Sequence, residues 1–289
     1  VKSKWDQSDV MMITYGDSIK KEGRPPLREL NNFMVSQLKN TMSGVHILPF
    51  NPYSSDDGFS VIDYTTVNPE LGSWDDITAL GNEFSVMADL VINHCSRESL
   101  WFKNYEKNKA PGRGYFINGL EFEDLSQVVR PRSTPLLTEI HAVDGVKQVW
   151  CTFGEDQVDL NYRNPDVLLE IVRIIRQYVE QGIHFFRLDA IAFLWKESGT
   201  TCVHLRQTHE LIKLLRLVIE NLDPSAVIIT ETNVPNRENL SYFGNDNEAH
   251  LIYNFSLPPL LLYSILSGDC KHLKTWMTSM PPARSGRAY

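Results

Sequence analysis

The sequence predicts a (β/α)8 barrel, a TIM-barrel fold, with a small subdomain inserted after its third strand. Short apolar runs alternate with helical patterns of apolar residues, and short connections join them, which is typical of parallel βα units. Charged and polar residues follow several of the apolar runs. In such barrels the carboxyl ends of the strands form the active-site face.

The first three strands are expected within residues 1–94, the first part of the barrel domain. Apolar runs predict strands at 9–19, 44–50 and 85–94, and apolar periodicity predicts helices at 26–40 and 74–84. In the first helix the following apolar side chains fall close to one face: Leu27, Leu30, Phe33, Met34 and Leu38. Such a face is expected to pack against the sheet.

The regular alternation stops between residues 95 and 157. This stretch is rich in glycine, proline, aromatic and charged residues, and it shows no sustained helical period. A loop of that length without structure of its own is uncommon in a compact domain. Residues 95–157 are therefore expected to form the inserted subdomain.

The barrel is expected to resume in residues 158–289. Asn164 as the cap and Pro165 at the first helical position predict a helix that leads to the fourth strand. The predicted elements are a helix at 165–181, a strand at 182–190, a helix at 208–221, strands at 226–233 and 250–257, and a helix at 258–266. From residue 267 onward the sequence shows no regular pattern. Because eight βα units close a barrel, the chain is expected to be incomplete, without strands 7 and 8 and a C-terminal domain.

Composition argues against several classes of protein. The 289 residues carry 28 Lys and Arg against 36 Asp and Glu, a net charge of −8, so no basic surface for nucleic acid or an anionic membrane is expected. No apolar run approaches the ~18 residues of a membrane span. The four cysteines lack metal-type spacing, no metal site is expected, and a reducing cytoplasm is the expected compartment. The oligomeric state is left open, and a homodimer is compatible with the sequence.

Arg187 and Asp189 end the fourth predicted strand two residues apart, so their side chains should share a face. One interpretation is a buried ion pair with a structural role. The other is a catalytic carboxylate that the arginine keeps ionised. Polar or aromatic residues at other strand ends favour the second interpretation: Tyr15, Asp17, Asp56, Asp57, Asp89, Asn93, His94, Glu231, Asn254 and Phe255.

Two carboxylates in different surroundings are typical of glycoside chemistry. A retaining mechanism needs a nucleophile and a general acid/base about 5–5.5 Å apart. Asp189 beside Arg187 suits the nucleophile. Glu231 follows the apolar run Val-Ile-Ile-Thr without an adjacent cation, which suits the general acid.

Three segments resemble successive signature regions of the α-amylase family of glycoside hydrolases: DLVINH at 89–94, FRLDA at 186–190 and TETN at 230–233. Other segments resemble the sucrose phosphorylase subgroup of that family: SSDDGFSVIDY at 54–64, LGSWDDI at 71–77, VRPR at 129–132, KESGTTC at 196–202 and NFSLPPLLL at 254–262. The resemblance runs from about residue 9 to residue 268 in the same order and spacing, and it implies the barrel fold with its inserted subdomain.

The resemblance also implies residue roles. Asp189 would be the nucleophile that forms a covalent β-glucosyl enzyme, Glu231 the general acid/base and Arg187 the partner of the nucleophile. Four residues would contact substrate: Asp56 the outer hydroxyls of glucose, His94 the 6-hydroxyl, Phe59 the sugar as an apolar platform, and Arg132 the acceptor side. The implied reaction is reversible phosphorolysis of a small α-glucoside to α-glucose 1-phosphate. Inorganic phosphate would be the co-substrate, with no other cofactor.

Two departures from the sucrose phosphorylase pattern bear on the substrate. Val129 stands where sucrose phosphorylases carry Tyr, and ETNVPNREN at 231–239 resembles the glucosylglycerate phosphorylase branch. We therefore expect a phosphorylase of the glucosylglycerate type. Sucrose or sucrose 6-phosphate phosphorylase, and α-glucosidase or transglucosylase, are the alternatives in the same class.

The family pattern also includes a third carboxylate, in a His-Asp pair on the seventh strand. After Leu266 the chain contains only Asp269, in Ser-Gly-Asp-Cys, which does not match. A site without that carboxylate should lose transition-state stabilisation. Two further alternatives follow, an inactive truncated fragment and a non-catalytic amylase-like domain. Intact Arg187, Asp189 and Glu231 weigh against the second.

Overall fold

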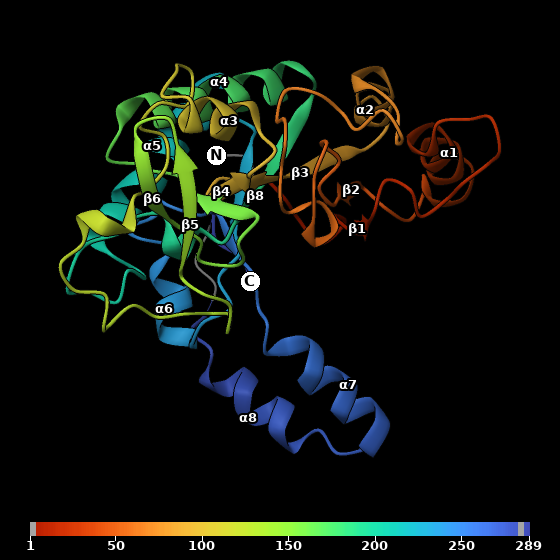
Figure 1. The fold of residues 1–289 in the computed structure, drawn as a ribbon. Helices are drawn as coiled ribbons and strands as arrows, with labels where there is room; N and C mark the ends of the chain where they lie inside the picture. The colour runs from red at the N-terminus through yellow and green to blue at the C-terminus, as the bar shows by residue number, and fades with distance from the viewer. Residues whose placement is uncertain (1–3, 283–285) are drawn as a thin grey trace.

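The computed structural model describes residues 4–282 and 286–289. Its centre is a sheet of six parallel strands (Figure 1). The order of the strands across this sheet is also their order along the chain. These strands are β1 (Met11–Thr14), β2 (Gly44–Ile47), β3 (Ser85–Val91), β8 (Ile183–Asp189), β9 (Val227–Thr230) and β10 (Leu251–Ile252). The predicted parallel barrel architecture is confirmed. Within the described residues no further strand joins this sheet, so β1 and β10 are its outer strands.

Helices lie between successive strands of this sheet. They are α1 (Pro26–Phe33), which continues into a π-helix (Met34–Leu38), α2 (Trp74–Gly81), α4 (Pro165–Glu180), α5 (Arg206–Leu222) and α6 (Asn236–Ser241). A further helix, α7 (Leu257–Ser267), follows β10. The predicted start of α4 is confirmed, because the side chain of Asn164 accepts a hydrogen bond from the amide of Asp166 and Pro165 opens the helix. This cap satisfies one of the backbone donors that a helix start leaves free.

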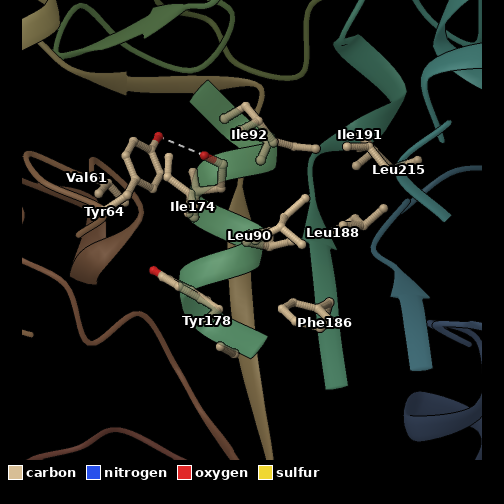
Figure 2. Close-up of a cluster of buried hydrophobic side chains, with 14 of the residues drawn as sticks. Val61, Tyr64, Leu90, Ile92, Ile174, Tyr178, Phe186, Leu188, Ile191 and Leu215 are labelled. Atoms are coloured by element: carbon tan, nitrogen blue, oxygen red, sulfur yellow. Dashed lines mark hydrogen bonds between the residues drawn. The ribbon is translucent and has the colours of Figure 1, made fainter. Parts of the chain in front are cut away.

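The core lies between the sheet and its helices. Figure 2 shows side chains from β3, β8, α4 and α5 that meet there: Leu90, Phe186, Leu188, Ile174, Tyr178 and Leu215. The hydroxyl of Tyr178 donates to Oδ1 of Asn51 at 2.8 Å, so this polar group has a partner inside the core. The packing fixes the ends of β3 and β8, which carry charged residues into the site described below.

The third strand is shorter than predicted, and this changes the position of His94. β3 ends at Val91, and His94 opens β4 (His94–Ser96), which pairs antiparallel with β7 (Gln157–Asp159). The hydroxyl oxygen of Tyr64 lies 2.8 Å from the carbonyl oxygens of Val91 and of His94, which share its single hydrogen. It thereby satisfies backbone acceptors that a neighbouring strand would otherwise bind. Residues 85–94 therefore belong to two sheets.

The stretch between β4 and β7 contains more regular structure than its sequence pattern predicts. It includes α3 (Leu100–Glu106) and a hairpin of β5 (Leu137–Ala142) and β6 (Gly145–Trp150). The overlooked signal is Asp144 before Gly145, a pair typical of hairpin turns. Gly145 has a φ of 124°, a conformation that side chains with a Cβ rarely adopt. The domain boundaries at residues 94 and 157 stay predictions.

A helix that the sequence pattern does not predict follows α7. This helix, α8 (Lys271–Ser279), packs against α7, and the pair extends away from the body of the protein (Figure 1). Helices this short have little intrinsic stability, so the sequence signal is weak. Within the described residues no helix is long and apolar enough to cross a membrane.

Candidate active site

Residues at the carboxyl ends of the sheet strands surround a cavity of about 300 Å³. All seven residues predicted to act on substrate line this cavity, and they come from both halves of the chain. The lining residues are Tyr15, Asp56, Asp57, Phe59, His94, Arg132, Phe153, Gln157, Arg187, Asp189, Ala190 and Glu231. The predicted convergence of strand ends therefore holds in the structure, while the role of each residue stays a proposal.

Arg187 contacts two buried carboxylates. Its Nη1 donates to Oδ1 of Asp189 at 2.7 Å and to Oδ1 of Asp89 at 2.5 Å. The strand register explains both contacts, because Asp89 is the β3 partner of Arg187 and Asp189 lies two residues further along β8 on the same face. Nε2 of His46 lies 2.9 Å from the second oxygen of Asp89. Asp89 thus holds Arg187 in place.

The ionisation of Asp189 differs from the prediction. Burial raises the pKa of Asp189 to about 7, and the charges of Glu231 and Asp89 act in the same direction. Arg187 lowers the pKa through its charge and its hydrogen bond, but it does not offset the burial. The prediction that Arg187 keeps this carboxyl fully ionised is therefore wrong in its net result. Loss of solvation is the larger effect.

This pKa predicts that Asp189→Asn stabilises the protein at alkaline pH. The folded-state pKa of about 7 lies above the value of an unfolded Asp, about 3.9. The stability that the proton contributes is therefore complete below the unfolded value and is lost as the pH rises through about 7. The stability advantage of the variant should grow by roughly 2–3 kcal/mol between pH 5 and pH 8. Urea unfolding of both proteins at the two pH values measures it, and an advantage independent of pH contradicts the assignment.

Two aromatic rings lie against Arg187. Its guanidinium carbon is 5.4 Å from the ring centre of Phe59 and 5.6 Å from that of Tyr253, distances that allow cation–π attraction. Phe59 is thus beside the partner of the candidate nucleophile, and its role as a sugar platform stays a prediction. Tyr253 is not among the predicted site residues. It lies inside the predicted sixth strand at 250–257, whereas in the structure β10 ends at Ile252 and Tyr253 follows it directly.

Glu231 directly follows β9 and lies beside the end of β8. Its amide donates to the carbonyl oxygen of Leu188 at 3.0 Å, and its Oε2 accepts from the amide of Ala190 at 3.3 Å. Its side chain is half-buried, whereas Asp189 is buried. Two carboxylates from neighbouring strands therefore line one cavity in different surroundings, as glycoside chemistry requires.

Asp156 and the first residue of β7, Gln157, hold the loop that carries Asp56. Asp56 and Asp57 have φ values of 54° and 51°, a region that residues other than glycine seldom adopt. Gln157 donates from Nε2 to Oδ2 of Asp56 at 2.8 Å. Oδ2 of Asp156 accepts hydrogen bonds of 2.5, 2.6 and 2.8 Å from three hydroxyls of the same loop: Ser54, Ser55 and Ser60. Sequence reasoning missed Asp156 and Gln157, because these contacts join distant parts of the chain and no local pattern encodes them.

His94 lines the cavity with both ring nitrogens in contact with protein atoms. Nε2 lies 2.9 Å from the carbonyl oxygen of Phe59, and Nδ1 lies 3.2 Å from Nδ2 of Asn93. Burial lowers the pKa of His94 and thereby favours the neutral ring. The predicted contact of His94 with a sugar hydroxyl is not tested by these contacts.

Arg132 reaches the cavity from the segment before the β5–β6 hairpin. It is exposed and brings a positive charge to a cavity that also carries Asp56, Asp57 and Glu231. Arg130, two residues earlier, does not line the cavity. Asp269 lies in the turn between α7 and α8, where its Oδ1 accepts a hydrogen bond of 2.8 Å from the amide of Lys271.

Comparison with known proteins agrees with this geometry. The profile of the alpha-amylase catalytic domain matches residues 38–279. A glucosylglycerate phosphorylase of Spirochaeta thermophila is 51% identical over 94% of this chain and 46% of its own length, and one of Escherichia coli is 48% identical over 96% and 50%. The crystal structure of sucrose 6F-phosphate phosphorylase from Thermoanaerobacter thermosaccharolyticum superposes with a TM-score of 0.85 at 25% identity, covering 96% of this chain and 58% of that one. This chain spans about half the length of the curated relatives that it matches. The chain belongs to the α-amylase family.

Proposed function

We propose that this cavity is the glucosyl-transfer site of a retaining α-glucoside phosphorylase, with glucosylglycerate as the donor substrate. The observation that carries the proposal is the meeting of Asp189, Glu231 and Arg132 in one cavity. The two carboxylates supply the nucleophile and the acid/base, and the arginine supplies a cation for phosphate. Two relatives that are named glucosylglycerate phosphorylases are 51% and 48% identical to this chain in sequence, which supports this choice of substrate.

The proposed reaction has two displacements. An ionised oxygen of Asp189 attacks the anomeric carbon, the bond to the glycerate oxygen breaks, and Glu231 gives its proton to that oxygen. In the second step an oxygen of phosphate attacks the same carbon from the face that glycerate left. The bond to Asp189 then breaks, and Glu231 takes up the proton of the phosphate. Two inversions leave an α-linked glucose 1-phosphate.

The pKa of Asp189 sets an expected pH limit for this reaction. Only the ionised carboxylate can attack, and burial raises the pKa of Asp189 to about 7. Activity measured as kcat/KM should therefore fall below about pH 7, by about tenfold for each pH unit. A profile that stays flat down to pH 5 contradicts the assignment of Asp189 as the attacking group.

The choice of substrate is tested by product analysis. The purified chain is incubated with glucosylglycerate, glucosylglycerol, sucrose or sucrose 6F-phosphate, with and without phosphate, and α-glucose 1-phosphate is measured. Glucosylglycerate should give the highest rate, and only with phosphate present. Sucrose as clearly the best donor overturns the substrate. Release of glucose at equal rates without phosphate favours an α-glucosidase.

Arg132 is expected to serve the acceptor side of the cavity. Glycerate and phosphate are both anions, and a guanidinium binds such groups with charge-assisted hydrogen bonds. Arg132→Gln should raise the KM for phosphate by about tenfold or more, the value of one such bond. Arg130→Gln is the matched control, because Arg130 is also exposed but does not line the cavity. Equal effects of the two substitutions contradict the role of Arg132.

The cellular setting is also a proposal. Cys95, Cys151, Cys202 and Cys270 are all free thiols, which supports a reducing compartment such as the cytoplasm. The proposed partners are a small α-glucoside and inorganic phosphate, with no other cofactor. A homodimer and the absence of nucleic-acid binding stay predictions.

A further inference from the structure

A buried lysine next to the cavity has oxygen neighbours from three segments. Lys196 is 3% exposed, and its Nζ lies 2.5 Å from Oδ2 of Asp159 and 3.1 Å from Oδ1 of Asn93. It also donates to the carbonyl oxygen of Phe193. A buried ammonium is costly unless it is paired and hydrogen-bonded, and here it is both. Lys196 does not line the cavity, so it has no direct access to substrate there.

Lys196 and Asp159 together fix the orientation of the Asn93 amide. The lysine donates to the oxygen of this amide, while Nδ2 of Asn93 donates to Oδ2 of Asp159 at 3.0 Å. An amide turned by 180° would place its NH₂ group against the ammonium and its oxygen against the carboxylate. Both contacts would be repulsive, so the charge pair allows one orientation.

The fixed amide in turn determines the tautomer of His94. Nδ2 of Asn93 lies 3.2 Å from Nδ1 of His94, and as a donor it requires that nitrogen to accept. The proton of the neutral ring must then be on Nε2, which lies 2.9 Å from the carbonyl oxygen of Phe59. We propose that the Lys196–Asp159 pair is a positioning unit that acts through Asn93 to hold His94 as the neutral Nε2–H tautomer, and its effect on sugar binding rests on the proposed function.

One contact of His94 opposes this tautomer and two favour it. Nε2 of Gln157 lies 3.2 Å from Nε2 of His94, and as a donor it would favour an accepting Nε2. The shorter contact of 2.9 Å with the carbonyl oxygen of Phe59 and the donor of Asn93 at Nδ1 both require the proton on Nε2. The Gln157 amide donates to Asp56 at 2.8 Å and lies 3.4 Å from the carbonyl oxygen of Phe59, which has a lone pair for each donor. The charged groups that act on the ring are Asp159, Lys196 and Asp56.

The consequence is a fixed conformation of the loop that carries Asp56 and Phe59. The Nε2–H of His94 donates to the carbonyl oxygen of Phe59, and Gln157 donates to Asp56 on the same loop. A ring that changed its tautomer would turn an acceptor toward the Phe59 carbonyl oxygen and release that anchor. Lys196 thereby acts on the donor side of the cavity without touching the substrate.

Nitrogen-15 NMR of the histidine rings tests the tautomer directly and needs no catalytic activity. The His94 signals are assigned by their loss in His94→Gln. In the unmodified chain the ring should show the neutral Nε2–H pattern at pH 7. In Asn93→Ala, which leaves the Lys196–Asp159 pair in place, His94 should populate both tautomers. Lys196→Met should shift the ring in the same direction but less, because the carboxylate of Asp159 still accepts from Nδ2 of Asn93.

Matched controls separate this role from general destabilisation. Lys213→Met removes a lysine from a partly exposed ion pair on α5, and Asn32→Ala changes an exposed residue of α1. Neither control should alter the His94 signals. An Nδ1–H ring in the unmodified chain overturns the proposal, and so does an unchanged Nε2–H ring in Asn93→Ala. The second criterion remains decisive if Lys196→Met fails to fold.

Kinetics connect the tautomer to function. Asn93→Ala should raise the KM for glucosylglycerate by about tenfold, the value of one lost hydrogen bond, with a smaller change in kcat. A loss of kcat at constant KM contradicts a role in sugar binding. If the unmodified chain shows the Nε2–H ring but no phosphorolysis, the proposed function fails while the control of His94 by the charge pair stands.

Discussion

Asp189→Asn is expected to lower glucosyl transfer by at least about 10³-fold, because an amide oxygen cannot form the covalent intermediate. The substitution keeps the size of the side chain and the capacity to accept a hydrogen bond from Arg187. The folded structure should persist. At pH 8 the variant should be more stable than the parent chain, because the amide avoids the cost of a buried negative charge that raises the pKa of Asp189. If Asp189→Asn both lowers the rate of glucosyl transfer and raises the stability at pH 8, then the burial of Asp189 is kept for catalysis at a cost in stability.

The measurement combines initial rates of phosphorolysis with urea unfolding of the same preparations. Asp269→Asn is the matched control, because Asp269 lies in the turn between α7 and α8 and does not line the cavity. The control should retain the parent rate. A rate for Asp189→Asn within tenfold of the parent chain would exclude Asp189 as the nucleophile.

Arg187→Met is expected to destabilise the fold by about 3–5 kcal/mol, the usual cost of removing one partner from a buried ion pair. The guanidinium bonds both Asp89 and Asp189, and its loss leaves two buried carboxylates without their shared cation. Arg187 lowers the pKa of Asp189, so without it proton uptake by Asp189 limits the destabilisation at low pH. The loss should therefore be larger at pH 8 than at pH 5, because a folded-state pKa raised above the unfolded value removes stability as the pH rises.

Arg176→Met provides the comparison for Arg187→Met. Arg176 forms an exposed pair with Glu180 one turn away on α4, and such pairs contribute about 0.3–0.5 kcal/mol. Urea unfolding of both variants at the two pH values separates a buried network from a surface pair. Similar losses for the two substitutions would contradict the central position of Arg187.

The sequence predicts the site better than it predicts the elements around it. Each short apolar run followed by polar residues marks a strand end, and in a parallel sheet these ends meet at one edge. That rule places Asp189, Glu231 and Asp56 together without knowledge of their contacts. The sequence predicts the strand boundaries less well, because a buried strand end such as residues 92–94 has the same composition whether it stays in the sheet or leaves it.

Other features depend on contacts that no local pattern encodes. Gln157 meets Asp56 across 101 residues of chain, and Tyr253 meets Arg187 only once the sheet has formed. The pKa of Asp189 follows from the balance between desolvation, which raises it, and the charge and hydrogen bond of Arg187, which lower it. The neighbouring arginine is visible in the sequence, whereas the depth of burial is visible only in the fold.

The most direct test of the site is the capture of its covalent intermediate. The chain carrying Glu231→Gln is incubated with α-glucosyl fluoride, whose leaving group needs no proton from residue 231, and is then digested for mass spectrometry. A glucosyl group is expected on the peptide that contains Asp189, and phosphate should remove it from the parent chain as α-glucose 1-phosphate. A glucosyl group on any other residue, or no adduct at all, would contradict the assignment of Asp189 as the nucleophile.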